Sequence, residues 1–369
     1  MKKRRIVLAS ILKPVDDTRM FEKMAVSLAR VNEYEIFVIG FPTKEPKVIS
    51  QNITQIPLKK FNRLSIGRLL APLKVLNYIY KVKPEIVMVN THDLLIVSCV
   101  NRIFFGTRII YDIRENYWRN ILNTTAFPSL LRPPLAGLVR LKEKLFAPLF
   151  QAFILAERTY KNELKFVHGK SLIIENKTLV PAGFMRVKDE EKIKLLFSGT
   201  LAESTGVFEA IELSKKLHQL DSRIELTIIG FCALAPTLME IKKSIQNFPF
   251  ITLIGGGELI PHAHIFEAIA TADFGIICYP SSHHIENRIP TKLYEYLACK
   301  LPIILTDYAP WLEICKPYQA ALPINMKDYN PEDLMSKMLG NTFYTSEPTD
   351  VTWASEEPKL LNLIAKFLV

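Results

Sequence analysis

The sequence of 369 residues has few cysteines and glycines and no long apolar run. Its five cysteines are scattered and form no Cys-x-x-Cys pair, which argues against a disulfide framework or a zinc knuckle and favours a reducing, cytoplasmic compartment. Only 14 glycines are present, which excludes a collagen-like chain. Because no run reaches about 18 apolar residues, we expect no membrane-spanning helix. The apolar run after the basic N-terminus ends at Lys13-Pro14, too early to predict a signal peptide.

Basic residues are unevenly distributed along the chain. Residues 1–190 hold 32 Lys and Arg against 16 Asp and Glu, whereas residues 191–369 hold 15 against 21. This asymmetry predicts an anionic partner for the N-terminal half, of which nucleic acid, an anionic membrane surface and a phosphorylated substrate are the candidates. No recognisable nucleic-acid-binding module accompanies the charge, so we expect no nucleic-acid partner.

Short β-branched runs alternate with amphipathic stretches along almost the whole chain, which predicts parallel sheets covered by helices on both faces. The segment 180–192, which contains Pro and Gly and then charged residues, divides the predicted strands into six before and five after. We therefore expect an α/β fold of two doubly wound domains, residues 1–180 and 181–350, facing a central cleft that binds the ligands. The predicted strands cover residues 5–10, 34–41, 85–90, 107–113, 152–157, 170–175, 193–199, 223–230, 251–256, 274–280 and 302–307. The amphipathic stretches that predict helices include residues 19–30, 66–82, 207–220, 261–270, 290–299 and 359–367.

The most informative segment follows the predicted strand 274–280. Pro290 suits the first turn of a helix, whose free N–H groups and dipole can bind a diphosphate. Lys292 lies in the same turn, and Glu295 lies one turn further on, where a carboxylate can accept hydrogen bonds from both hydroxyls of a ribose. The alternative is that Lys292 and Glu295 are solvated side chains on an ordinary amphipathic helix.

Polar side chains also follow predicted strands in the N-terminal half, where parallel sheets build their sites. Asp16 or Asp17 can cap the helix after the first strand, or Asp17 contributes to a site. His92, beside Asp93, is either a structural residue or a group that orients an acceptor hydroxyl and moves its proton. The histidine pairs 262/264 and 283/284 have no carboxylate or cysteine at ligand spacing, so we expect no metal.

The segment from Asn287 to Glu295 resembles the donor motif of the retaining glycosyltransferases of family 4, in the variant Asn-x-x-Pro-x-Lys-x-x-Glu. The resemblance implies the GT-B fold, with an acceptor domain first, a nucleotide-sugar domain second, and residues 351–369 as a helix that returns to the first domain. It implies that Glu295 binds the ribose and that Asn287, which stands where the family usually has a first glutamate, lies beside the donor sugar. The other donor-site residues that it implies are Gly199, Thr200, Arg288, Thr291 and Lys292.

The turn 197–206 is similar to the first strand-turn of that family's donor domain. Thr200 and Thr205 stand where the family usually has an Arg and a Lys that bind the pyrophosphate. In the N-terminal half, segments 90–93 and 111–116 are similar to the family's His-Asp and Tyr-Asp-x-His-Glu turns. The resemblance implies catalytic roles for His92, Asp93 and Asn287, and its acceptor-side candidates are Asp17, Arg19, Asp112, Arg114 and Glu115.

Two basic and apolar stretches, residues 59–83 and 127–150, lie in the N-terminal half. Such helices either lie in the plane of an anionic bilayer or pack on a core with their lysines in solvent. If these helices lie on a bilayer, the resemblance predicts a cytoplasmic protein that binds peripherally to the inner face of the cytoplasmic membrane.

The sequence and the resemblance together predict a retaining glycosyltransferase that uses neither a metal nor another cofactor. We expect it to move a sugar from a nucleotide-diphosphate donor to a hydroxyl of a glycan or lipid-linked acceptor, in the synthesis of bacterial surface polysaccharide or lipopolysaccharide. One alternative is a nucleotide-sugar epimerase or hydrolase of the same fold, which consumes donor without an acceptor. The other is a degenerate, non-catalytic protein that binds a nucleotide sugar without turnover.

Overall fold

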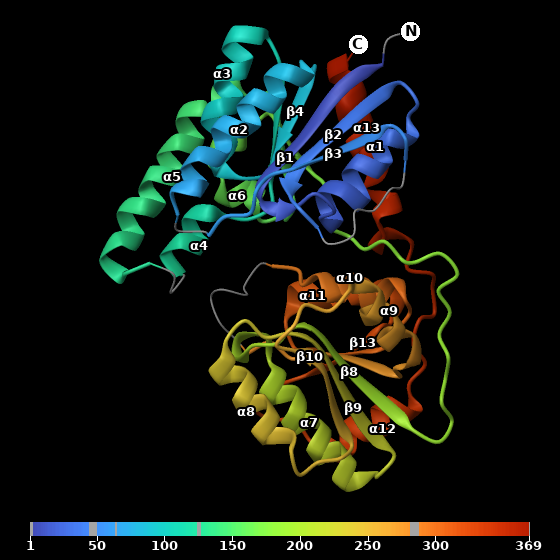
Figure 1. Cartoon of the computed structure of the whole chain (residues 1–369). Coiled ribbons are helices and arrows are strands. Elements are labelled where there is room, and N and C mark those ends of the chain that lie inside the picture. Colours follow the sequence, from blue (N-terminus) through green and yellow to red (C-terminus); the bar gives the residue numbers. More distant parts are fainter. Residues whose placement is uncertain (1–2, 44–49, 63–64, 124–126, 281–287, 369) are drawn as a thin grey trace. The chain divides into compact units, whose positions relative to one another are not determined.

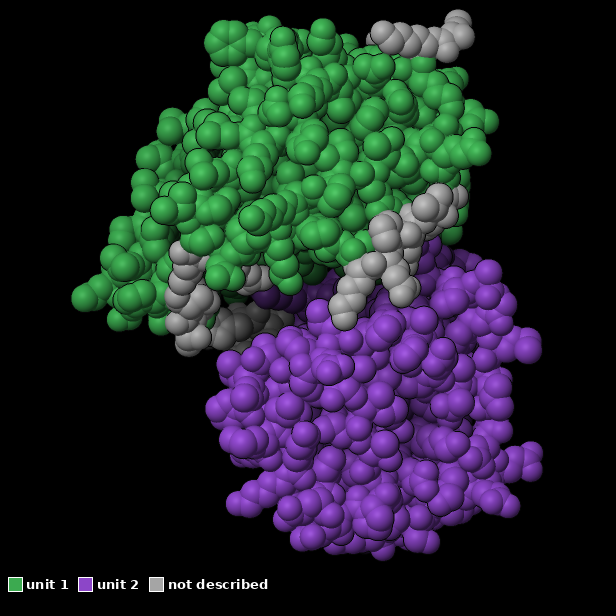
Figure 2. All heavy atoms as spheres, in the orientation of Figure 1, with its two compact units in different colours: residues 1–176, 353–369 green, residues 177–352 purple. Residues whose placement is uncertain are grey.

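The chain folds into two compact units (Figure 2). Unit 1 combines residues 1–176 with residues 353–369, and unit 2 comprises residues 177–352. Each unit is a parallel β-sheet with helices on both faces (Figure 1), which is the α/β arrangement that the alternation of strands and helices predicts. A computed structural model describes residues 3–43, 50–62, 65–123, 127–280 and 288–368.

Unit 1 has a seven-stranded sheet in the order β3-β2-β1-β4-β5-β6-β7, in which every paired strand is parallel to its neighbour. Helices α2 and α3 pack on one face of this sheet, and α5 packs against α3. The strands are β1 (Arg4–Pro14), β2 (Tyr34–Phe41), β3 (Ile53–Pro57), β4 (Ile86–Val89), β5 (Arg108–Ile113), β6 (Ala152–Leu155) and β7 (Ser171–Ile173). The α-helices are α1 (Val26–Arg30), α2 (Ile66–Val82), α3 (Leu95–Phe105), α4 (Tyr117–Asn123), α5 (Arg132–Phe146), α6 (Tyr160–Glu163) and α13 (Glu357–Leu368).

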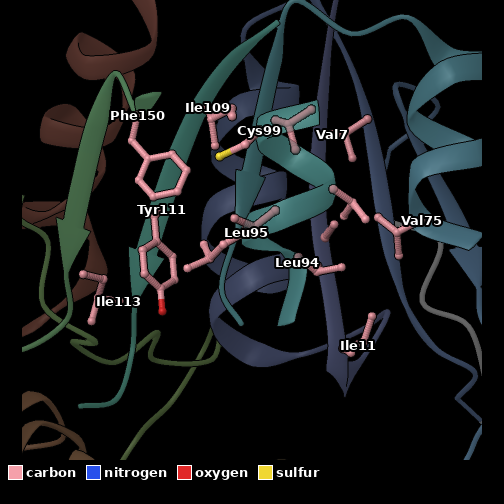
Figure 3. Packing of buried hydrophobic residues seen from close by; sticks show 14 of the residues in the cluster. Val7, Ile11, Val75, Leu94, Leu95, Cys99, Ile109, Tyr111, Ile113 and Phe150 are labelled. Atoms are coloured by element: carbon pink, nitrogen blue, oxygen red, sulfur yellow. The ribbon is translucent and has the colours of Figure 1, made fainter. Parts of the chain in front are cut away.

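The core of unit 1 forms where α3 meets the central strands (Figure 3). Leu95 and Cys99 of α3 lie against Ile109 and Tyr111 of β5, and Phe150 lies beside Tyr111 with ring centroids 6.0 Å apart. Burial raises the pKa of the Cys99 thiol to about 12. Cys99 therefore serves as a small apolar side chain in this core.

The last segment of unit 1 is separated in sequence from the rest of the unit. Helix α13 packs on α1 and on η1 (Thr18–Ala25), a π-helix that precedes α1. The Trp353 indole N–H donates a hydrogen bond of 2.8 Å to the Ser27 hydroxyl. Glu356, which is fully buried, accepts a hydrogen bond of 3.0 Å from the backbone N–H of Glu175. Two buried polar contacts therefore fix this segment to the first part of the chain.

Unit 2 has a six-stranded sheet in the order β10-β9-β8-β11-β12-β13, also with parallel pairing. Helices α7, α8 and α12 contribute to the core on one face, and α9, α10 and α11 to the core on the other. The strands are β8 (Ile193–Thr200), β9 (Ile224–Phe231), β10 (Ile251–Gly256), β11 (Phe274–Ile277), β12 (Ile303–Thr306) and β13 (Ala321–Ile324). The α-helices are α7 (Val207–Leu220), α8 (Ala235–Ile245), α9 (His262–Thr271), α10 (Thr291–Ala298), α11 (Ala309–Cys315) and α12 (Pro331–Gly340).

The structure contains all eleven strands that the sequence predicts, and it adds β3 and β13. Both added strands contain proline and lie at a sheet edge, where a missing N–H breaks no ladder on the outer side. The predicted helices 66–82 and 207–220 form with those bounds as α2 and α7. In the part of the chain that the structure describes, no helix combines the length and apolar character needed to cross a membrane.

Candidate functional site

In unit 2, helix α10 begins next to the carboxyl ends of the parallel strands, the edge at which open α/β sheets bind ligands. Its first helical residue is Thr291, and Pro290 is the N-cap with φ −65° and ψ 135°. The sequence places Pro290 inside the first turn, so the helix starts one residue later than predicted. The backbone N–H groups of Thr291 and Lys292, in the first turn, still cannot form hydrogen bonds within the helix.

Lys292 is buried in the first turn of α10. Its Nζ lies 4.0 Å from the ring centroid of Phe197 and 5.4 Å from that of Tyr279. Among the described residues, Nζ has no hydrogen-bond partner. Burial lowers the pKa of this ammonium to about 8, although Cys278 and Glu295 act in the opposite direction. A buried cation that makes only ring contacts is costly until an anion pairs with it.

The turn after β8 lies beside Lys292 and depends on glycine. Gly199 has φ +99°, and a Cβ at this position would be 3.8 Å from Lys292 Cε. Gly206 has φ +82°, and its Cβ would be 2.0 Å from the carbonyl oxygen of Cys278, so no other residue fits there. The Thr205 hydroxyl donates to the Thr200 carbonyl at 2.8 Å. Thr205 therefore closes the turn, while Thr200 is exposed.

Glu295 is buried one turn after Lys292, and its Oε1 lies 2.8 Å from Nε2 of His262. A His262 protonated at Nε2 donates to this carboxylate and fixes its orientation. The sequence alone does not reveal this pair, because the two residues lie on different helices, α9 and α10, and no local spacing connects them. No group of three or more metal-ligating side chains is found in the described segments.

The other donor-site candidates lie close to α10 in sequence. Thr291 is exposed at the start of the helix. Arg288 is partly buried, and its carbonyl accepts a hydrogen bond of 2.6 Å from the Trp311 indole N–H. Asn287 lies outside the described residues.

Four of the acceptor-side candidates in unit 1 form two buried ion pairs. Arg19 binds both carboxylate oxygens of Asp112, at 2.8 to 3.2 Å, and also donates to the carbonyl of Ile174 at 2.9 Å. Arg114 donates to Asp17 at 2.7 and 3.2 Å. These pairs connect η1 and its N-cap to β5 and to the residue that follows it.

Asp17 is the N-cap of η1, since its Oδ1 accepts from the backbone N–H groups of Arg19 and Met20. Burial by itself raises the pKa of this carboxyl, but Arg114 and the Met20 N–H hold the pKa below its usual value. Of the two interpretations of Asp17 in the sequence analysis, the structure thus contains the helix cap.

A cavity of about 480 Å³ opens at the carboxyl ends of β1, β4 and β5. It brings together four of the predicted residues, His92, Asp93, Arg114 and Glu115, whereas Asp17, Arg19 and Asp112 are not part of its lining. Its remaining wall is formed by Leu12, Lys13, Arg68, Asn90, Thr91, Tyr117, Asn120, Ile121, Phe127, Leu135, Leu138 and Val139. One part of the cavity is therefore charged and the other is apolar.

His92 occupies a positively charged environment in this cavity. The Lys142 ammonium lies 3.0 Å from His92 Nδ1, and the Tyr117 ring packs edge-on against the imidazole. Asp93 is held by Arg68 at 3.0 and 3.2 Å. Burial lowers the pKa of His92 to about 4, with Asp93 opposing the shift and Lys142 adding to it. His92 is thus neutral at pH 7 and better suited to hydrogen bonding than to carrying a proton.

We expect the imidazole of His92 to stay neutral until the pH falls to about 4, because burial disfavours its charged form and protonation would also place a second positive charge next to Lys142. Replacing Lys142 with methionine should raise the pKa of His92 only in part, because burial, the larger cause, remains. The measurement is an NMR titration of histidine-labelled protein, with the His92 signal assigned from a His92→Gln variant. Lys144→Met removes an exposed lysine from the same helix and should leave the midpoint unchanged. A wild-type midpoint near 6.5 contradicts this account.

A larger cavity, of about 710 Å³, opens at the opposite edge of the unit 2 sheet, near the amino ends of β8, β11 and β12. Its lining includes Arg186, Asp189, Arg223 and Asp273 together with Phe274 and Phe343. Ligands of open parallel sheets bind at the carboxyl ends of the strands, so the size of this cavity does not make it the site.

Comparison with known proteins connects these features to a family. Residues 184–339 match the family model described as glycosyl transferases group 1. This segment begins in unit 2 and includes Gly199, Lys292 and Glu295. No curated protein matches the sequence.

Several solved structures share the fold of the whole chain. The sucrose-phosphate synthase from Thermosynechococcus elongatus is 14% identical, with a TM-score of 0.73 and 99% of each chain covered. The Anabaena protein HepE, in complex with UDP-glucose, is 12% identical, with a TM-score of 0.64, 98% of this chain and 99% of that chain covered. The UDP-forming trehalose-phosphate synthase from Burkholderia xenovorans is 12% identical, with a TM-score of 0.63 and both chains fully covered at 100%. The chain therefore has the GT-B fold, and the larger part of its second unit is similar in sequence to the group 1 glycosyl transferases.

Proposed function

We propose that this protein is a glycosyltransferase that moves a sugar from a nucleotide-diphosphate donor to a hydroxyl group. The observation that carries the proposal is the buried Lys292 ammonium, which has no hydrogen-bond partner in the described structure and lies beside the Gly199 turn at the start of α10. The match of residues 184–339 to the group 1 glycosyl transferases supports it, and so does the likeness to a structure that contains UDP-glucose.

In this proposal, α10 binds the donor along its first turn and a half. Lys292 and the free N–H groups of Thr291 and Lys292 bind the diphosphate, and they stabilise the negative charge that develops on it as the sugar leaves. Glu295, which His262 orients, accepts hydrogen bonds from the ribose hydroxyls. We assign Asn287 to the donor sugar and Gly199, Thr200 and Arg288 to the phosphate side, and the transfer needs no metal and retains the anomeric configuration.

The cavity of unit 1 is the proposed acceptor site. Its charged part, with His92, Asp93, Arg114 and Glu115, suits the hydroxyls and charged groups of an acceptor, and its apolar part suits an apolar portion of the same molecule. A lipid-linked or glycan acceptor of this kind places the enzyme in the synthesis of bacterial surface polysaccharide or lipopolysaccharide, on the cytoplasmic side.

We expect one nucleotide among UDP, GDP, ADP, CMP and dTDP to raise the melting temperature of the protein. A ligand at 100 times its Kd adds about 2.7 kcal/mol to the free energy of unfolding, which is readily measured. Glu295→Ala should lose most of this stabilisation, because it removes the carboxylate that we assign to the ribose. Glu240→Ala, an exposed change of the same kind on α8, should keep it.

The outcomes of this experiment separate the possible functions. Absence of a shift with every nucleotide would overturn the donor site. If the preferred nucleotide sugar is consumed without an acceptor, the protein is an epimerase or hydrolase. If it is bound but never turned over with any acceptor offered, the protein is a non-catalytic binder.

A further inference from the structure

Helix α2 exposes an apolar stripe on the side that faces away from the core. Its buried side chains, which include Val75 and Ile79, pack on the sheet. The outward side chains recur at helical spacing, and Leu69 is 76% exposed. They are Ile66, Leu69, Leu70, Leu73 and Tyr80. The packing of unit 1 accounts for the apolar face of α2 that covers the core, but it does not account for a second apolar face that is exposed to solvent.

The same feature recurs on the two helices beside α2. Helix α3 contacts both α2 and α5, and the three lie side by side in Figure 1. The exposed large apolar side chains are Ile96, Ile103, Phe104 and Phe105 on α3, and Leu138, Leu141 and Leu145 on α5. The rings of Tyr80 and Phe105 meet with centroids 5.5 Å apart, which joins the stripes of α2 and α3. We call the outward surface of these three helices the α2–α3–α5 face.

The α2–α3–α5 face is also basic. Its three helices contain eight Lys and Arg and a single acidic residue, Glu143. Three of these cations are engaged within unit 1, namely Arg68, Arg140 and Lys142. Glu143 is buried, where it accepts a hydrogen bond from the Tyr111 hydroxyl and pairs with Arg140. These helices therefore present no exposed carboxylate, whereas Lys74, Lys81 and Lys144 are exposed among the leucines.

We propose that the α2–α3–α5 face docks on an anionic lipid bilayer. Leucine and phenylalanine side chains enter the boundary between headgroups and acyl chains, and the lysines lie at the level of the lipid phosphates. The charge selects this partner over a second copy of the chain, because a symmetric dimer would bring two such basic faces together. The residues that carry this inference are separate from those of the proposed donor site.

The position of the cavity agrees with this surface. Leu138 of α5 lines the cavity and is also part of the α2–α3–α5 face. A molecule anchored in the bilayer by an apolar chain thus reaches the apolar part of the cavity without leaving the lipid surface.

Flotation of the full-length protein with lipid vesicles tests the proposal. Wild type should bind phosphatidylcholine vesicles that contain about one third phosphatidylglycerol, and bind pure phosphatidylcholine far more weakly. Leu69→Gln with Leu73→Gln should lower the partition coefficient by more than about tenfold, because both side chains lose their burial in lipid. Lys74→Gln with Lys81→Gln should lower it by about fivefold for each lysine removed.

Matched changes in unit 2 serve as controls. Leu234→Gln with Leu339→Gln removes two exposed leucines, and Lys242→Gln with Lys243→Gln removes two exposed lysines, so both pairs should bind as wild type does. Circular dichroism verifies that each variant is folded. The proposal fails if wild type does not float with the anionic vesicles, or if the unit 1 variants bind as well as the controls. It also fails if those variants instead abolish a concentration-dependent dimer seen in sedimentation. Nucleotide binding by all variants, measured separately, keeps this result distinct from the donor-site test.

Discussion

Replacing Lys292 with methionine is expected to stabilise the nucleotide-free protein and to abolish its stabilisation by nucleotide. The two effects have opposite signs because the buried ammonium destabilises the free protein, whereas the same charge is needed to bind the nucleotide. Without ligand, its Nζ lies near the rings of Phe197 and Tyr279 and has no hydrogen-bond partner among the residues that the structure describes. With a diphosphate bound, it would donate charge-assisted hydrogen bonds.

The pKa of Lys292 gives the size of the first effect. A fall from 10.5 to about 8 corresponds to about 3 kcal/mol of disfavoured charge at neutral pH. Methionine recovers this and loses the ring contacts, so we expect a net gain of about 2 kcal/mol in the free energy of unfolding.

The pH dependence follows from the same pKa. Between about pH 8 and 10.5 the unfolded chain holds a proton that the folded protein has released. The free energy of unfolding therefore rises with pH across this window: the penalty for burying the charged Lys292 is complete below about pH 8 and is gone above about pH 10.5. The methionine variant should lack this rise.

Urea unfolding at pH 7 and pH 9.5, with and without the preferred nucleotide, measures all of these effects. Lys243→Met, an exposed change on α8, is the matched control and should alter neither stability nor binding. A methionine variant that is less stable than wild type, or one that still binds nucleotide with full affinity, is incompatible with a buried ammonium kept for a phosphate.

The second large effect is expected at the buried ion pair of unit 1. Asp112→Asn should lower the free energy of unfolding by roughly 3–5 kcal/mol, because it leaves the Arg19 guanidinium buried without its counter-charge. Arg19 is 1% exposed at the side chain, so solvent cannot replace the lost carboxylate.

An exposed pair provides the comparison. Asp333 and Lys337 form an ion pair of 2.6 Å on α12, with about half of each side chain exposed. Asp333→Asn makes the same chemical change there and should cost at most about 1 kcal/mol. Equal losses from the two substitutions would show that burial does not control the energy of the Arg19–Asp112 pair.

The sequence predicts those parts of the fold that depend on local pattern. The helices 66–82 and 207–220 and the eleven strands can be predicted because the apolar residues of amphipathic helices and of buried strands follow recognisable patterns in the sequence. Edge strands β3 and β13 escape prediction, since they are short and contain proline. The start of α10 is predicted to within one residue, because proline restricts where a helix begins.

The candidate site is predictable only in part, because its geometry depends on contacts between distant segments. The positions of Lys292 and Glu295 follow from one helix, but the contact of His262 with Glu295 needs the packing of α9 on the sheet. Likewise, Lys142 belongs in sequence to a basic amphipathic stretch, and only the tertiary structure brings its ammonium to His92. The periodicity of the sequence predicts neither of these contacts.

The return of residues 353–369 to unit 1 sets the order in which the protein can be completed as it is synthesised. Unit 2 is a continuous segment, so all of its residues are synthesised before residues 353–369. Unit 1 is translated first but cannot be completed then, because Trp353 and Glu356 have yet to reach Ser27 and Glu175. Until they arrive, the surface of α1 and η1 that α13 covers is exposed to solvent, so the unit that is synthesised first is completed last.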